Sequence, residues 1–182
     1  ALVQDGLTVV LSPLIALMKD QVDALNARGI DATFINSSLT KEARIARYRA
    51  IENDSYRLLY ITPERFQKSE FRRVLGGRRV TLLAIDEAHC VSQWGHDFRP
   101  DYTRVGEIRE FLGCPTTLAL TATATHDVQQ DIVHQLGLEE ADVHFWRYEG
   151  AATQRTQETS SWRGASTRHQ HVATRKTPAS SS

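Results

Sequence analysis

Short, continuous apolar segments alternate with amphipathic segments along the first 146 residues of the chain. Most of the apolar segments are four to six residues long, which is the length of a strand buried on both faces. The segments between them repeat apolar residues at helical spacing. Uninterrupted apolar strands separated by helices are typical of a mostly parallel sheet with helices on both faces. The expected fold class is therefore α/β.

The periodicity predicts the positions of the individual elements. We expect strands at Leu7–Leu11, Ala32–Ile35, Arg57–Ile61, Val80–Ile85, Thr117–Leu120 and, as a short last strand, Val143–Phe145. We expect helices over Leu14–Arg28, from a Thr40 cap to about Asn53, and over Glu64–Leu75, Asp101–Leu112 and Asp127–Leu136. In such sheets ligands bind outside the carboxyl ends of the strands, so polar residues directly after a strand are the functional candidates.

Length and composition indicate a single globular domain. A chain of 182 residues can bury one sizeable core but not two. No apolar run approaches the roughly 20 residues of a membrane helix, and the N-terminus does not resemble a signal peptide. Two cysteines, Cys90 and Cys114, do not make a disulfide framework, which favours a reducing cytosolic setting. His89, Cys90 and His96 are too irregularly spaced to indicate a zinc site.

The last part of the chain differs from the rest in charge and composition. Residues 1–146 carry 16 Lys+Arg against 20 Asp+Glu, whereas residues 147–182 carry 6 against 2. From Ala151 to Ser182, 12 of 32 residues are Ser or Thr, and large apolar side chains are scarce. Such a segment buries too little surface to offset its ordering entropy. We therefore expect a domain over residues 1–146 and a disordered, Ser/Thr-rich, basic tail over residues 147–182.

The strongest chemical signal is an apolar strand that ends in two adjacent carboxylates, Asp86 and Glu87. One carboxylate at this edge can hold Mg²⁺, usually through water. The other can orient and deprotonate a water molecule that attacks a phosphoryl group. A strand followed by a solvated acidic turn would show the same two residues, so the pair alone does not decide the function.

The residues around this pair carry a family resemblance. Asp86-Glu87-Ala88-His89 is the helicase motif II (DEAH) box, and residues 90–102 (CVSQWGHDFRPDY) resemble the aromatic-rich loop of RecQ-family ATP-dependent DNA helicases. Residues 11–21 resemble motif Ia, residues 61–65 motif Ib and residues 119–124 motif III. The resemblance covers residues 1 to about 145 in family order. It implies part of the first RecA-like motor domain, with ATP and Mg²⁺ as cofactors.

The resemblance implies roles for the residues of motifs II and III. Asp86 would coordinate Mg²⁺, Glu87 would act as the general base, and both would bind the nucleotide. His89 would link the nucleotide site to the DNA side, although outside such a box a buried core histidine is the usual interpretation. Thr121 and Thr123 would couple the two sites.

The resemblance also implies contacts to DNA. In the family the loop that contains Gln93, Trp94, Phe98 and Arg99 senses single-stranded DNA. Flat rings stack on any base and a guanidinium pairs with phosphate, but aromatic residues four apart also pack in cores. The surrounding Gly95 favours an irregular polar loop.

Three further residues could follow the DNA backbone. Ser12 and Thr62, just past strand ends, suit contacts to phosphate, and Arg65 could assist them. Helix capping by the two hydroxyls and a solvated Arg65 explain these residues equally well.

The chain departs from the family pattern in one decisive motif. A motor of this kind needs Gly-Lys-Ser/Thr to cradle the β- and γ-phosphates. None of the four lysines follows a glycine, and in the family this loop lies just upstream of the segment with which the chain begins. The strand that would feed the loop is missing as well, so we expect a sheet that is incomplete at its N-terminal edge, with an exposed flank. A second motor domain with its arginine finger is also missing, and the family-like sequence gives way abruptly to the tail near Phe145. This change suggests a truncated or frame-shifted product that is inactive alone, and a genuine divergent tail is the alternative.

The resemblance implies an ATP-dependent 3′–5′ DNA helicase of RecQ type in DNA repair and recombination. Its substrates would be single-stranded and forked duplex DNA, and its location the bacterial cytoplasm, at the nucleoid. One alternative is a non-enzymatic module that binds single-stranded DNA. The other is an RNA helicase, against which the loop at residues 93–100 argues.

Overall fold

A computed structural model of the chain describes residues 5–95, 97–138, 142–146, 158–159 and 171–176. The strands are β1 (Leu7–Leu11), β2 (Ala32–Ile35), β3 (Leu58–Ile61), β4 (Val80–Ile85), β5 (Thr116–Thr121), β6 (Asp142–Trp146), β7 (Glu158–Thr159) and β8 (His171–Lys176). The α-helices are α1 (Ile15–Asn26), α2 (Lys41–Glu52), α3 (Ser69–Gly76), α4 (Val105–Phe111) and α5 (His126–Gln135). Three short 3₁₀ segments are η1 (Pro63–Gln67), η2 (Ala88–Val91) and η3 (Pro100–Arg104).

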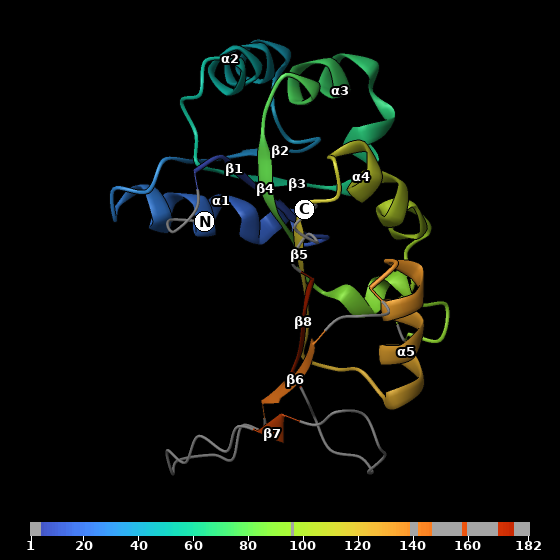
Figure 1. The fold of residues 1–182 in the computed structure, drawn as a ribbon. Coiled ribbons are helices and arrows are strands. Elements are labelled where there is room, and N and C mark those ends of the chain that lie inside the picture. Colours follow the sequence, from blue (N-terminus) through green and yellow to red (C-terminus); the bar gives the residue numbers. More distant parts are fainter. Residues whose placement is uncertain (1–4, 96, 139–141, 147–157, 160–170, 177–182) are drawn as a thin grey trace, which may run out of the picture.

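The strands form one sheet in the order β2-β3-β1-β4-β5-β8-β6-β7 (Figure 1). The pairs within β2-β3-β1-β4-β5 are all parallel, as expected from the alternation of strands and helices. β1 lies between β3 and β4, and its Leu7, Val9 and Leu11 are fully buried. The α/β fold class is therefore confirmed.

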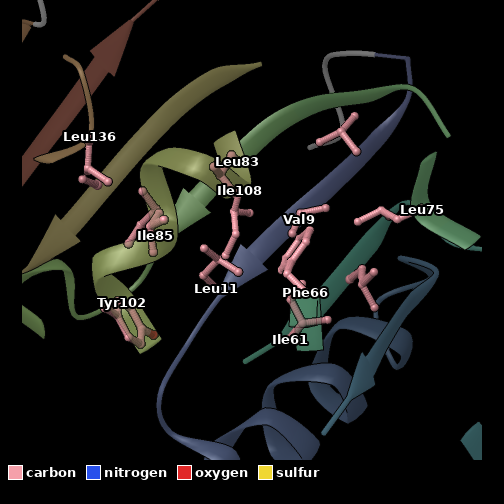
Figure 2. Close-up of a cluster of buried hydrophobic side chains, with 14 of the residues drawn as sticks. Val9, Leu11, Ile61, Phe66, Leu75, Leu83, Ile85, Tyr102, Ile108 and Leu136 are labelled. Carbon is pink, nitrogen blue, oxygen red and sulfur yellow. The ribbon is translucent and has the colours of Figure 1, made fainter. Parts of the chain in front are cut away.

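Helices cover both faces of the sheet. On one face, Met18 and Val22 of α1 form a small apolar cluster with residues of β2 and β3. The opposite face carries the larger cluster, to which α2, α3, α4 and α5 contribute. Figure 2 shows part of this larger cluster, in which Val9, Leu11, Ile61, Leu83 and Ile85 project from the strands. No helix in the described part of the chain is long and apolar enough to cross a membrane.

Most element positions agree with the sequence analysis, and the differences have local causes. Thr40 caps α2 as expected, because its Oγ1 accepts a hydrogen bond from the Ala43 N–H at 3.2 Å. The helix expected over Glu64–Leu75 is divided into η1 and α3, since the backbone of Lys68 is extended (φ −88°, ψ 115°). The helix expected over Asp101–Leu112 likewise begins as η3, with Pro100 in its first turn.

The tail differs from the expectation at two positions. β7 and β8 lie within residues 147–182, where we expected disorder. β8 pairs antiparallel with both β5 and β6, so the backbone groups on that side of β5 have hydrogen-bond partners. The exposed flank expected at the N-terminal edge of the sheet stays a prediction. The other residues of the tail lie outside the described part of the chain, and the domain boundary at residue 146 stays a prediction.

The first prediction concerns the centre of the sheet. Leu83 of β4 is fully buried, so Leu83→Ala should lower the free energy of unfolding by about 3 kcal/mol through lost burial and the cavity left behind. Denaturant unfolding measures this change. Leu17→Ala is the matched control, because Leu17 of α1 is 47% exposed. Equal effects of the two substitutions would contradict this arrangement of the core.

Candidate functional site

The carboxylate of Asp86 lies directly beyond β4, and three hydrogen bonds hold this residue. Its backbone N–H donates to the Leu11 carbonyl at 2.8 Å. Its Oδ2 accepts from Ser12 Oγ at 3.0 Å, and its Oδ1 accepts from the Glu87 N–H at 3.1 Å. These bonds fix the orientation of the carboxylate. Because the side chain is only half-buried, the carboxylate is still open to a ligand.

Ser12 is positioned differently from what its expected role requires. Its side chain is 1% exposed, and its hydroxyl faces Asp86 rather than solvent. The same oxygen accepts a hydrogen bond from the Leu14 N–H at 3.3 Å. The structure therefore joins the segment after β1 to the carboxylate after β4, and a direct contact of Ser12 with DNA stays a prediction.

Glu87 adopts the left-handed backbone conformation, with φ 49° and ψ 47°. A non-glycine residue rarely adopts this conformation, because its Cβ crowds the backbone. The turn redirects the chain from β4 into η2. It also leaves the Glu87 carboxylate partly exposed, with Oε2 3.3 Å from His89 Nδ1.

His89 connects the carboxylates to the segment after β5. The ring is buried, and its Nδ1 lies 3.0 Å from Thr121 Oγ1 as well as near Glu87. Thr121 is itself buried, and its Oγ1 accepts a hydrogen bond from the Thr123 N–H at 3.3 Å. The three residues expected to connect motifs II and III are therefore in one chain of contacts. This arrangement fits a satisfied buried histidine and a coupling residue equally.

The aromatic side chains of the loop after η2 do not both pack in the core. Trp94 is 78% exposed and Phe98 is 36% exposed, and Gln93 is exposed beside them. The alternative of a buried aromatic pair therefore does not hold for Trp94. Its ring is available to stack on a ligand.

Arg99 joins this loop to the segment after β1. Its Nη1 donates to the Pro13 carbonyl at 3.4 Å, and its Nη2 lies 3.1 Å from Asp97 Oδ2. Next to Arg99 is a cavity of about 230 Å³, formed where the segments after β1 and β3 meet the aromatic loop. It is lined by Pro13, Ile15, Thr62, Pro63, Glu64, Arg99, Asp101 and Tyr102.

Thr62 and Arg65 are less open to a ligand than expected. Thr62 is 4% exposed, and its hydroxyl donates to the Glu64 carboxylate. Arg65 is half-buried, and its Nε is buried without a hydrogen-bond partner. Of these two residues, Thr62 lines the cavity beside Arg99. Their contact with DNA stays a prediction.

The sequence was compared with known protein families. The family model described as DEAD/DEAH box helicase matches residues 2–132. The chain belongs to the DEAD/DEAH box helicase family. The match includes the carboxylates after β4 and the segments after β1, β3 and β5.

Several proteins similar to the chain are named ATP-dependent DNA helicases, among them the RecQ helicases of two bacteria. The chain is 51% identical over 140 residues to the ATP-dependent DNA helicase RecQ of Bacillus subtilis, which covers 76% of this chain and 24% of that protein. It is 49% identical over 138 residues to RecQ of Haemophilus influenzae, with 76% and 22% covered. It is 45% identical over 151 residues to ATP-dependent DNA helicase Q5 of Mus musculus, with 80% and 15% covered. The chain thus spans about a quarter or less of the length of these relatives.

A solved structure supports the fold. The Hef helicase domain of Pyrococcus furiosus aligns with a TM-score of 0.53 at 16% identity, covering 76% of this chain and 29% of that one. At this identity the likeness concerns the fold alone. It agrees with a RecA-like arrangement of the parallel strands.

One polar cluster of the helicase chain was not found by sequence reasoning. His89, Cys90 and Asp97 bring potential metal-ligand atoms within 4.8 Å of one another. Burial and the nearby Asp97 raise the pKa of the Cys90 thiol to about 11, so the thiol is protonated at neutral pH. Asp97 is also paired with Arg99. In the structure the Cys90 thiol donates to Asp97 Oδ2 at 3.8 Å, so the cluster joins η2 to the aromatic loop.

Gly95 is a second residue that sequence reasoning undervalued. A Cβ at this position would lie 2.4 Å from the His89 carbonyl oxygen and 3.2 Å from that of Ser92. The loop therefore folds back onto the backbone of motif II so closely that only glycine fits. A glycine next to an aromatic residue in a polar loop was the available signal for this close approach.

The second prediction tests this packing. Gly95→Ala should lower the free energy of unfolding by about 1–3 kcal/mol, because the loop must move away from the His89 carbonyl. Gly77→Ala is the matched control, since a Cβ there would meet nothing within 4 Å. Thermal or denaturant unfolding compares the two proteins. If the Gly95→Ala protein is as stable as the Gly77→Ala protein, the loop does not lie against motif II.

Proposed function

We propose that the chain is part of the first motor domain of a RecQ-type ATP-dependent DNA helicase. The observation that supports this most strongly is the continuity of the site. The Asp86 carboxylate accepts from the Glu87 N–H, and the Glu87 carboxylate connects through His89 to Thr121. Segment η2 leads on from these residues to the exposed ring of Trp94. A motor that couples phosphoryl transfer to DNA movement needs such a connection between its nucleotide side and its DNA side.

The carboxylates suit the nucleotide side. Asp86 offers a fixed, half-exposed oxygen set of the kind that Mg²⁺ prefers, and Ser12 orients it. When bound, Mg²⁺ with ATP would supply charge neutralisation at the phosphates. Glu87 would orient the attacking water and accept its proton, and His89 would hold the Glu87 carboxylate in place.

The phosphate-binding part of such a site is not encoded in the 182 residues, because no lysine follows a glycine. We infer that the chain alone binds ATP weakly and needs further protein for turnover. The 3′–5′ polarity, the role in repair and recombination, the preference for single-stranded or forked DNA and the cytoplasmic location all belong to this proposal. The names of the relatives support DNA as the substrate class.

The third prediction concerns ATP hydrolysis. The chain should show no DNA-stimulated turnover above that of its Glu87→Gln variant, because positioning of the phosphates accounts for most of the catalysis in this reaction class. Phosphate release with and without single-stranded DNA measures it. Turnover that disappears with Glu87→Gln would contradict the inference and would mean that the phosphates are held in another way.

A second candidate function is a non-enzymatic module that binds single-stranded DNA. The exposure of Trp94 and the nearby Arg99 support it, because stacking and phosphate pairing need no nucleotide hydrolysis. The two functions share the same DNA-binding loop. ATP hydrolysis in a longer protein that contains this domain would separate them.

The fourth prediction tests the loop itself. Trp94→Ala should weaken binding of single-stranded DNA roughly five- to a hundredfold, because one stacked base contributes about 1–3 kcal/mol. Fluorescence anisotropy with a labelled oligonucleotide measures the affinity. Leu17→Ala is the control: it removes an exposed apolar side chain that lies on α1 and not in the loop, and it should leave the affinity unchanged.

Salt provides a further check on the same complex. Removal of Arg99 should lower both the affinity and its dependence on salt concentration, since each neutralised phosphate releases counterion. The basic tail can also hold DNA, and its contribution should remain in every variant. If neither Trp94→Ala nor Phe98→Ala changes the affinity of the folded chain, the loop is not its DNA-binding site.

A further inference from the structure

We propose that Asp131 of α5 is a positioning residue that sets the orientation of the DNA-binding loop through Ser92. This inference rests on the proposed function of the loop and adds to it a connection that starts from α5. Asp131 would not touch DNA. It would determine where the Trp94 ring stands when DNA arrives.

The connection consists of two hydrogen bonds that share one oxygen. Ser92 Oγ donates to Asp131 Oδ2 at 2.7 Å, and the same Oγ accepts from the Trp94 N–H at 3.2 Å. Ser92 is fully buried, whereas Trp94 two residues later is 78% exposed. The bond therefore marks the point at which the buried segment after η2 becomes the exposed loop.

The Asp131 carboxylate is well suited to hold this hydroxyl. An ionised carboxylate only accepts hydrogen bonds, so it fixes the direction of the Ser92 O–H and leaves the lone pairs of Oγ for Trp94. Its other oxygen, Oδ1, accepts from Gln135 Nε2 at 3.3 Å, one helical turn further along α5. The carboxylate is thus held on both sides.

A second contact keeps the loop close to this anchor. The Gly95 N–H donates to the Ser92 carbonyl at 3.1 Å, in a turn that lies against the His89 carbonyl. The backbone on either side of the Trp94 side chain is therefore tied to Ser92. Because Ser92 is tied in turn to Asp131, a movement of α5 relative to η2 would shift the Trp94 ring.

The beginning of α5 is connected to motif III. Thr125 caps the helix by accepting from the Val128 N–H at 3.5 Å, and Gln129 Nε2 donates to the Ala124 carbonyl at 2.9 Å. The helix therefore follows the segment that contains Thr121 and Thr123. This gives motif III a route to the loop that does not pass through the His89 ring.

A double-mutant cycle on the whole chain tests the proposal. The labelled oligonucleotide of the fourth prediction is the probe, and the variants are Asp131→Ala and Trp94→Ala, alone and combined. Asp131→Ala should weaken binding about threefold or more, but not more than Trp94→Ala, since it acts only through that ring. In the Trp94→Ala background, the same change should weaken binding less than about twofold. Asp131→Asn, which keeps an acceptor oxygen, should restore most of the affinity.

Hydrogen exchange of the loop amides measures, in the absence of DNA, how firmly the loop is held. Asp131→Ala should speed exchange at residues 93–95, and Asp131→Asn should not. Asp127→Ala, at an exposed position on the same helix, is the matched control and should change neither measurement.

The outcomes separate the two proposals. Equal losses of affinity from Asp131→Ala in both backgrounds, or no loss while Trp94→Ala is harmful, would overturn the positioning role alone. If Trp94→Ala has no effect on affinity, the proposed function fails. Unchanged loop exchange in Asp131→Ala would then show independently that Asp131 does not hold the loop.

Discussion

The parallel pairing of β1 with β4 is the constraint on which the site depends. In this register Leu11 lies beside Ile85, so the residues that follow the two strands emerge together at one edge of the sheet. The Asp86 N–H extends the ladder by one more bond to the Leu11 carbonyl, and Ser12 Oγ reaches the carboxylate from the neighbouring strand. A shift of β4 by one residue relative to β1 would turn Ile85 to the opposite face of the sheet and separate Ser12 from Asp86. Core packing therefore fixes the geometry of the carboxylate.

Most of the parallel sheet could be predicted from the sequence, because a strand buried on both faces has a distinctive apolar run. β1, β2 and β4 have the bounds that their apolar segments predict. The break between η1 and α3 was harder to predict from the sequence, since the extended backbone at Lys68 depends on how η1 packs and not on local propensity. β8 could not be predicted from the composition of the tail, because its partner residues in β5 lie 51 to 59 positions away in the chain. Those residues supply the hydrogen bonds that a polar segment cannot provide for itself.

The site was predictable in its membership more than in its contacts. Motif spacing identified Asp86, Glu87 and His89, and the structure brings them together with Thr121. Motif spacing could not predict that Ser12 turns away from solvent toward Asp86, because a position after a strand does not determine the direction of a side chain. Contacts such as Ser92 with Asp131 join segments 39 residues apart and carry no local signal. Such pairs become visible only when the helices have been packed on the sheet.

The backbone of Glu87 has a consequence for anyone who redesigns this domain. A side chain in the left-handed conformation costs on the order of 1 kcal/mol, which glycine would largely avoid. Selection for thermal tolerance alone would therefore favour glycine or asparagine here and discard the carboxylate. The left-handed backbone at a glutamate therefore fits a functional role for this position rather than a role in folding. Stability screens should hold residue 87 constant, because glycine or asparagine there would remove the carboxylate to which the proposed function assigns the attacking water.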